Sequence, residues 1–254
     1  MKTSNTIAGY DFHCHVDLQQ NPSGYIAECE AQRVFTLAVT TTPKAWLQNK
    51  KLMADSHYVR PAIGLHPELV GDRYHELDLV KLCMKETSFV GEVGLDGSPE
   101  HKASFEAQRR VYEAILDEAQ HLGGRVITTH SRRAAAEVIA LLGARTTPDR
   151  VLNILHWFSG SKSEMRAGVA AGCMFSINPG MVKSKNGREL IGAIPVDRLL
   201  TETDSPFGKW EDRQARAEDV ITLVAAIAEI RHTESTLLAR AVRENALRVF
   251  DFTR

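Results

Sequence analysis

The sequence predicts an α/β fold, and in particular a (β/α)8 TIM barrel, because short strand-like runs alternate with helical patterns along almost all of its 254 residues. Several of these runs are apolar throughout, as in parallel strands that are covered on both faces. A doubly wound open sheet would produce the same alternation and is the alternative. A barrel makes one further demand, which is that functional side chains lie where strands end and loops begin.

Eight runs rich in β-branched and aromatic residues are the expected strands. They cover residues 8–13, 34–40, 58–64, 88–91, 125–129, 151–155, 173–176 and 198–201. Eight strands separated by helices in a chain of this length are what a barrel requires.

Helical signals occupy the intervals between the strands. Apolar residues recur at helical spacing from Tyr112 to Ala119. Ser98-Pro99-Glu100 is typical of a helix start, with a capping serine, a proline and an acid in the first turn. Ser161 and Glu164 form the pattern of a capping box. Two further helical patterns, at about 215–230 and 234–250, close the chain.

The composition is that of a globular protein, and without a linker or repeat we expect one domain over residues 1–254. Lys and Arg number 31 against 32 Asp and Glu, so the formal net charge is −1. A protein that coats nucleic acid would be more basic. Any attraction to nucleic acid must therefore be local, from a metal site and a few basic side chains.

The cysteines and apolar runs indicate a cytoplasmic protein. Cys14, Cys29, Cys83 and Cys173 lie far apart, which argues against a zinc ribbon or a disulfide scaffold. The longest uncharged apolar run, residues 220–228, is too short to span a bilayer, and no apolar run of signal-peptide length starts the chain. We expect no membrane association, and a monomer because no self-complementary stripe is present.

The first expected strand ends in a pair of histidines. Side chains alternate along a strand, so His13 and His15 should point to the same side, about 7 Å apart at their Cα atoms. Cys14 should then face the opposite way, into packing. Two imidazoles on one side can chelate a divalent metal, but this pair alone is a weak signal.

Further nitrogen and oxygen donors follow later strands. They are His66 after the third, Glu92 after the fourth, His130 after the fifth, His156 at the end of the sixth and Asp204 after the eighth. Each alone could be a hydrogen-bonded histidine, a helix-cap acid or a salt-bridge acid. Together on one face they would be costly to bury without cations.

This donor set indicates two divalent ions. Histidine and carboxylate ligands without thiolate suit Mg, Mn or Zn. Six protein ligands, His13, His15, Glu92, His130, His156 and Asp204, are too many for one catalytic ion that keeps an open position. Two ions with one bridging carboxylate fit better.

The motifs around these donors resemble the TatD family of metal-dependent hydrolases, which are amidohydrolase-like barrels. The matching segments are His13-Cys14-His15, Gly91 to Asp96, Thr129 to Arg132, His156 to Gly160 and Glu202 to Pro206. The resemblance extends to Glu244-Asn245-Ala246. It implies that His13, His15 and Asp204 hold one ion, that His130 and His156 hold the other, and that Glu92 bridges them. It also implies a nuclease, usually a DNA exonuclease.

Some positions depart from the common family pattern. Gly97 stands where a tyrosine is usual after Gly-Leu-Asp, Glu68 stands where a second histidine is usual, and residues 207–210 replace a loop rich in Pro and Arg. These departures leave substrate preference open. Segments 39–46, 94–99 and 156–161 resemble one branch, the QatD component of bacterial Qat anti-phage cassettes, which implies partner proteins of such a cassette.

The resemblance and the residue types assign catalytic roles. Asp204 can ligate an ion and act as general base, with Glu92 between the ions. His66 is the best further group facing substrate, as an acid or phosphate contact, although it could serve packing. Glu202 could orient a ligand histidine or be a structural acid.

Substrate contacts are expected from three side chains. Arg132 could hold a phosphate bidentately, or be an exposed arginine at a helix start. Lys185, with Lys183, lies in the loop expected after the seventh strand and could touch the nucleic-acid backbone or be solvated. Trp157 could stack on a base or pack in the wall.

Three functional hypotheses follow. The first is a two-metal phosphodiesterase acting on DNA at ends or on single strands. The second is an amidohydrolase or esterase acting on a small substrate, which is disfavoured because Glu92 stands where such barrels often place a carboxylated lysine. The third is a metal-binding subunit of a defence complex with little activity of its own.

Overall fold

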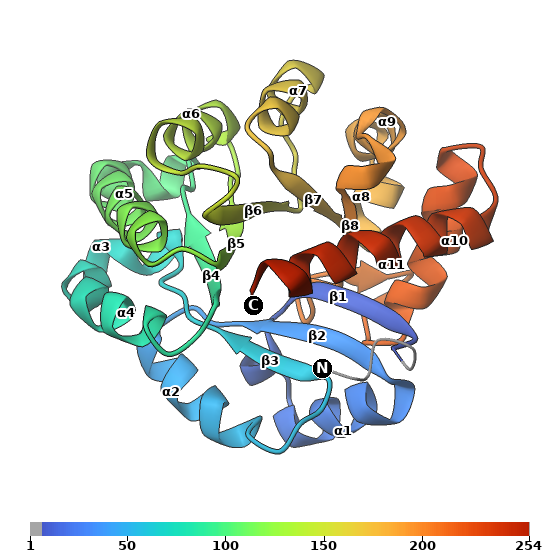
Figure 1. The fold of residues 1–254 in the computed structure, drawn as a ribbon, viewed down its shortest axis with the longest axis horizontal. Coiled ribbons are helices and arrows are strands. Elements are labelled where there is room, and N and C mark those ends of the chain that lie inside the picture. The colour runs from blue at the N-terminus through green and yellow to red at the C-terminus, as the bar shows by residue number, and fades with distance from the viewer. Residues whose placement is uncertain (1–6, 254) are drawn as a thin grey trace.

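The computed structural model describes residues 7–253, and they form a (β/α)8 barrel with helices around a ring of parallel strands (Figure 1). The strands of the ring are β1 (Gly9–Cys14), β2 (Val34–Val39), β3 (Val59–Ala62), β4 (Phe89–Gly94), β5 (Arg125–His130), β6 (Val151–His156), β7 (Met174–Ile177) and β8 (Leu199–Thr201). Each overlaps one of the strands expected from the sequence.

The ring consists of two ladders that meet at two seams. One ladder has the order β1-β2-β3 and the other β4-β5-β6-β7-β8. A bridge between Ile63 and Val90 joins β3 to β4. At the other seam, residues after β8 bond to β1, since the Asp204 amide donates to the His13 carbonyl and the His15 amide to the Ser205 carbonyl, both at 2.8 Å. Closure of the ring excludes the doubly wound sheet.

Helices surround the ring. They are α1 (Pro22–Gln32), α2 (Pro43–Leu52), α3 (Val70–Arg73), α4 (Leu77–Met84), α5 (Phe105–Leu122), α6 (Ala135–Arg145), α7 (Lys162–Ala170), α8 (Pro179–Lys183), α9 (Lys185–Ala193), α10 (Asp219–Ile230) and α11 (Ser235–Phe252). The predicted stripe from Tyr112 to Ala119 is the buried face of α5, and the predicted capping box of Ser161 and Glu164 opens α7. None of the helices in residues 7–253 is long and apolar enough to span a bilayer.

Two helix starts differ from the sequence prediction. Ser98 precedes a 3-10 helix (Pro99–Ser104), and its hydroxyl makes no capping bond. Its amide donates to Asp96. The predicted start near residue 215 is also wrong, since α10 begins at Asp219. The residues before it form a small hairpin of β9 (Lys209–Trp210) and β10 (Arg213–Gln214).

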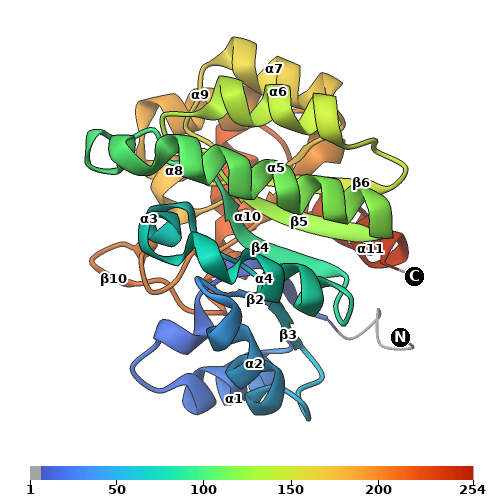
Figure 2. The same ribbon diagram turned by 90° about the vertical axis from the view of Figure 1, so that its left-hand side faces the viewer.

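Helix α11 covers the end of the barrel that faces the viewer in Figure 1. Its Phe250 ring lies 4.6 Å from Phe35 and 6.1 Å from both Phe12 and Tyr10, measured between ring centroids. These aromatic rings fill the amino-terminal end of the ring of strands. Figure 2 shows the end of α11 on one side of the barrel and the β9–β10 hairpin on the other.

Two strands carry an irregularity at a predicted ligand. In β1 the register with β2 shifts between Asp11 and Cys14, and in β4 the register with β5 shifts between Val90 and Val93. Such bulges re-aim one side chain. They therefore alter simple alternation at His13 and at Glu92, although Cys14 does pack away from the cavity, among Val16, Tyr25 and Cys29.

Candidate metal centre

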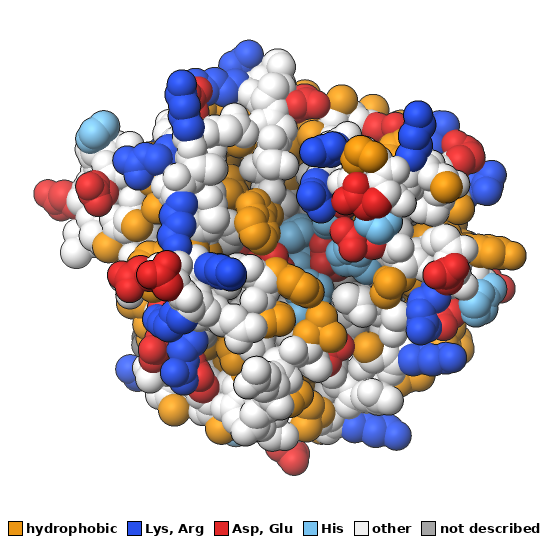
Figure 3. Space-filling view, turned by 180° about the vertical axis from the view of Figure 1, so that it is seen from behind, with side chains coloured by type: hydrophobic (Ala, Val, Ile, Leu, Met, Phe, Trp, Pro, Cys, Tyr) orange, Lys and Arg blue, Asp and Glu red, His pale blue; other side chains and the backbone are white. Residues whose placement is uncertain are grey.

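A cavity of about 560 Å³ opens at the carboxyl ends of the strands. Figure 3 shows it from behind the view of Figure 1, with histidines at its bottom and hydrophobic side chains beside it. It is lined by His15, Thr41, His66, Glu68, Leu69, Glu92, His130, Ser131, Arg132, His156, Trp157, Ser159, Asp204 and Phe207. The structure therefore brings together donors from β1, β4, β5, β6 and the segments after β3 and β8.

Glu92 lies at the centre of this set. One carboxylate oxygen, Oε2, lies 3.4, 3.2 and 3.2 Å from the Nε2 atoms of His13, His15 and His66. The other, Oε1, lies 2.7 Å from Nδ1 of His130 and 2.9 Å from Nε2 of His156. The two oxygens thus face two different groups of histidines, as a bridging carboxylate would.

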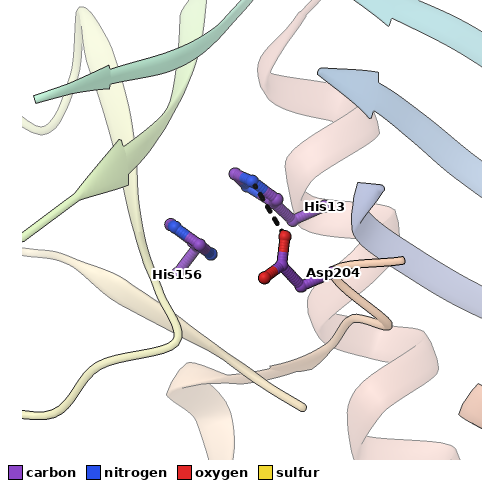
Figure 4. Close-up of side chains that lie close together, drawn as sticks. All are labelled: His13, His156 and Asp204. Carbon is purple, nitrogen blue, oxygen red and sulfur yellow. Dashed lines mark ion pairs between the residues drawn. The ribbon is translucent and has the colours of Figure 1, made fainter. Parts of the chain in front are cut away.

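Asp204 approaches the same histidines from the end of β8. Its Oδ1 lies 3.7 Å from Nε2 of His13 and 3.6 Å from Nε2 of His15. Figure 4 shows Asp204 directed toward His13, with His156 beside them. The rings of His13 and His156 are stacked, with 3.7 Å between their centroids. Residues from β1, β6 and the loop after β8 therefore meet at one point.

Outer partners hold three of the histidine rings. His13 Nδ1 lies 2.7 Å from the Thr128 hydroxyl, and His130 Nε2 lies 2.8 Å from Asp96 Oδ2. His156 Nδ1 lies 3.5 Å from Glu202 Oε1. In each ring the opposite nitrogen is the one directed at Glu92, so these partners fix which nitrogen faces the cavity.

The pKa values of the two carboxylates of the centre shift in opposite directions. Burial raises the pKa of Glu92, but the facing histidines, His66 and His156 foremost, hold this pKa well below its usual range. Burial raises the pKa of Asp204 to about 7, against the opposing effect of His156. A bound cation would lower this pKa and stabilise the buried Asp204 carboxylate.

The donor set fits divalent cations. Among the described residues, His13 Nε2 and Asp204 Oδ1 are buried and have no hydrogen-bond partner. Three groups at the centre have ligand atoms within 4.8 Å of one another: His13, His15 and Glu92; His13, His156 and Asp204; and His66, Glu92 and His130. Overlapping groups of hard and borderline donors are what adjacent Mg, Mn or Zn ions require.

The predicted substrate contacts are placed differently. Arg132 and Trp157 line the cavity, and so does His66. Lys185 is not among the described residues that line it. The expected loop is also wrong, because Lys183 ends α8 and Lys185 begins α9. Lys183 instead donates to the Glu211 carbonyl at 2.8 Å.

Several residues at the centre had no predicted role. Asp96 contacts the ring of His130. It lies four residues after Glu92 in an extended segment, so side-chain alternation predicts that both point to the same face of the strand. Phe207 lines the cavity and lies edge-on to His15, 5.2 Å between ring centroids. No sequence signal marked Thr128, because a single threonine within a strand is common.

The barrel and its cluster of histidines and carboxylates define a metal-dependent hydrolase. The profile of the family described as TatD related DNase matches residues 10–251. The chain is 30% identical to YcfH, a metal-dependent hydrolase of Escherichia coli K12, over 94% of each chain. It is 25% identical to human deoxyribonuclease TATDN3, over 94% of this chain and 93% of that one. The chain therefore belongs to the TatD-related DNase family.

A solved structure shares the whole fold. The crystal structure of YJJV, a TatD homologue of Escherichia coli K12, superposes with a TM-score of 0.84 at 22% identity, over 95% of this chain and 97% of that one. This likeness supports the fold of the barrel from end to end.

Proposed function

We propose that this protein is a two-metal phosphodiesterase that degrades DNA from its ends. One observation carries the proposal: Glu92 faces five histidines with both its oxygens, while Asp204 Oδ1 and His13 Nε2 are buried beside it without a hydrogen-bond partner. The name of human deoxyribonuclease TATDN3, a relative over most of the chain, supports DNA as the substrate.

The ligands divide into two sets under this proposal. His13, His15 and Asp204 would hold one ion, His130 and His156 would hold the other, and Glu92 would contribute to both sites. When bound, the two ions supply Lewis-acid stabilisation of phosphate oxygens and lower the pKa of water toward neutrality.

The remaining steps fall to side chains of this chain. Asp204 accepts the proton of the attacking water, since its side chain lines the cavity beside His15 and Glu92. His66, at the wall of the cavity, protonates the leaving oxygen or contacts the phosphate. Arg132 binds a phosphate from the rim, and Trp157, 37% exposed, stacks on a base.

The size of the cavity favours attack at an end. A volume of about 560 Å³ is within the range that encloses one small ligand. A terminal nucleotide can enter such a space, whereas a continuous duplex cannot.

The test is hydrolysis of end-labelled single-stranded and duplex DNA by chelator-stripped protein refilled with Mg, Mn or Zn. We expect metal-dependent cleavage with a ladder that starts at one end. Asp204→Asn should lower the rate about 10²- to 10⁴-fold, whereas Asp197→Asn, in an exposed 3-10 helix (Val196–Arg198) before β8, should not. Inert wild-type protein that hydrolyses an amide or ester instead would overturn the proposal.

We further propose that the hydrolase serves anti-phage defence together with partner proteins of a Qat-type cassette. The support is the resemblance of segments 39–46, 94–99 and 156–161 to the QatD branch of the family. Cells carrying the cassette should lose protection against phage when it encodes Asp204→Asn, measured as efficiency of plating. Equal protection by wild type and variant would contradict an enzymatic role in defence.

A further inference from the structure

The metal centre is built across one of the two seams of the barrel. His13 and His15 belong to β1 and the segment after it, whereas Asp204 follows β8 at the other end of the chain. Within residues 7–253, β1 and β8 are not paired in a ladder. Backbone hydrogen bonds from Asp204 to His13 and from His15 to Ser205 join the two segments, and a side-chain connection adds to them.

Asp11 supplies that connection. Its carboxylate is fully buried, its Oδ2 accepts the Thr203 hydroxyl at 2.6 Å, and its Oδ1 accepts the Thr203 amide at 2.9 Å. The same Oδ1 accepts the His13 amide at 3.3 Å. One side chain thus binds the backbone of a β1 ligand and the residue before Asp204.

Thr203 also restrains the residue that follows Asp204. Its hydroxyl oxygen accepts the Ser205 amide at 3.2 Å, so bonds from Asp11 and Thr203 flank Asp204 on both sides. Asp204 itself has a φ of 49°, in the left-handed region that non-glycine residues rarely occupy. Hydrogen bonds on either side stabilise this backbone conformation.

The other ligands do not need such a link. Glu92, His130 and His156 lie on or at the ends of β4, β5 and β6, which are consecutive neighbours in one ladder. Backbone pairing therefore sets the spacing of these strands, with a bulge at Glu92. The two halves of the centre differ in what holds them.

We propose that Asp11 is a positioning residue for the ion held by His13, His15 and Asp204, and that it has little influence on the ion held by His130 and His156. The proposal rests on the two-metal centre proposed above. Asp11 would set the geometry of one metal site through the backbone of His13 and through Thr203.

The test compares hydroxyl deletions on the same segment. Thr203→Val removes the hydroxyl bond to Asp11, whereas Thr201→Val, the matched control, removes a hydroxyl that bonds the Tyr10 carbonyl across the same seam. Asp11→Ala removes both bonds, and Asp11→Asn, which keeps the shape of the side chain, should restore part of the effect. Far-UV circular dichroism verifies the fold of each variant.

The readout is Mn²⁺ binding to chelator-stripped protein, by calorimetry and by electron paramagnetic resonance. Wild type and Thr201→Val should bind two ions with a spin-coupled spectrum. Thr203→Val and Asp11→Ala should weaken one site at least 10-fold, leave the other unchanged, and give the spectrum of an isolated ion at one equivalent and above.

Two outcomes overturn the role of Asp11 separately from the proposed function. Equal weakening of both sites, or the same loss in Thr201→Val, would show that Asp11 only supports the fold while the two-metal centre stands. Binding of fewer than two ions by wild type would overturn the two-metal centre, and this role of Asp11 with it.

Discussion

Glu92 concentrates the electrostatics of the metal centre in one side chain. Its two oxygens lie within 3.4 Å of nitrogens from five histidines. Since the carboxylate is almost completely buried, its charge is little screened by solvent. The orientation of each histidine ring therefore matters, because only one nitrogen of each can point at Glu92.

Two carboxylates contact candidate ligand histidines from outside the centre, and Asp96 makes the shorter contact. Its Oδ2 lies 2.8 Å from Nε2 of His130. Asp96→Asn can still accept or donate one bond but removes the charge that orients the ring. We expect metal affinity or activity to fall about 10- to 100-fold, as for other outer partners of metal ligands. Competition with a metal indicator measures this, and the exposed Asp55→Asn is the control.

An Asp96→Asn protein that binds both ions as tightly as wild type would contradict the role given to Asp96. A loss of thermal stability without a loss of metal affinity would place Asp96 in folding only.

At the scale of elements, the seam between β3 and β4 depends on one glycine. A Cβ atom at Gly64 would lie 2.2 Å from the Thr40 carbonyl oxygen and 2.4 Å from the Glu92 amide nitrogen. These are backbone atoms, which cannot move aside cheaply. The absence of a side chain at Gly64 thus allows β3 to approach the strand that carries Glu92.

Gly64→Ala should lower the free energy of unfolding by about 1–3 kcal/mol through overpacking. Gly143→Ala is the matched control, because a Cβ at Gly143 in helix α6 meets nothing within 4 Å. That substitution should raise stability by about 0.5–1 kcal/mol. Urea unfolding of both variants measures the difference, and changes of equal sign would contradict the close approach.

The strands were predictable from sequence because their apolar runs and turn residues are local signals. The clustering of the candidate ligands was predictable because parallel strands bring their carboxyl ends to one face. The bulges at His13 and Glu92 were not, since a register shift depends on the partner strand. Asp11 was missed for the same reason, because its partner Thr203 lies 192 residues away.

At the scale of the whole molecule, near-zero net charge limits attraction to DNA. With a formal charge of −1, binding must depend on a few local contacts. Affinity for a single-stranded oligonucleotide should still fall with salt. Arg132→Gln, in an Asp204→Asn background, should reduce the slope of log K against log salt by about 1, whereas Arg110→Gln on α5 should not. A flat salt response would contradict phosphate binding.

Metal removal should destabilise the whole barrel, because the ions bind the folded chain only. At 100 times the dissociation constant, a ligand contributes about 2.7 kcal/mol per site. In a chain of this size, 1 kcal/mol corresponds to about 2–4 °C, so a chelator should lower the melting temperature by about 5–10 °C for each ion removed. Calorimetry with and without added Mn²⁺ measures this, and unchanged melting would contradict a metal-loaded native state.

The division of the ring into two ladders makes this chain a natural candidate for a split reporter. A cut after Glu86, in the exposed turn between α4 and β4, would separate β1-β2-β3 from the other five strands. The first piece would carry His13, His15 and His66, and the second Glu92, His130, His156 and Asp204. Neither piece holds a complete set of ligands, so recovered enzymatic turnover would signal that two tagged proteins had brought the pieces together.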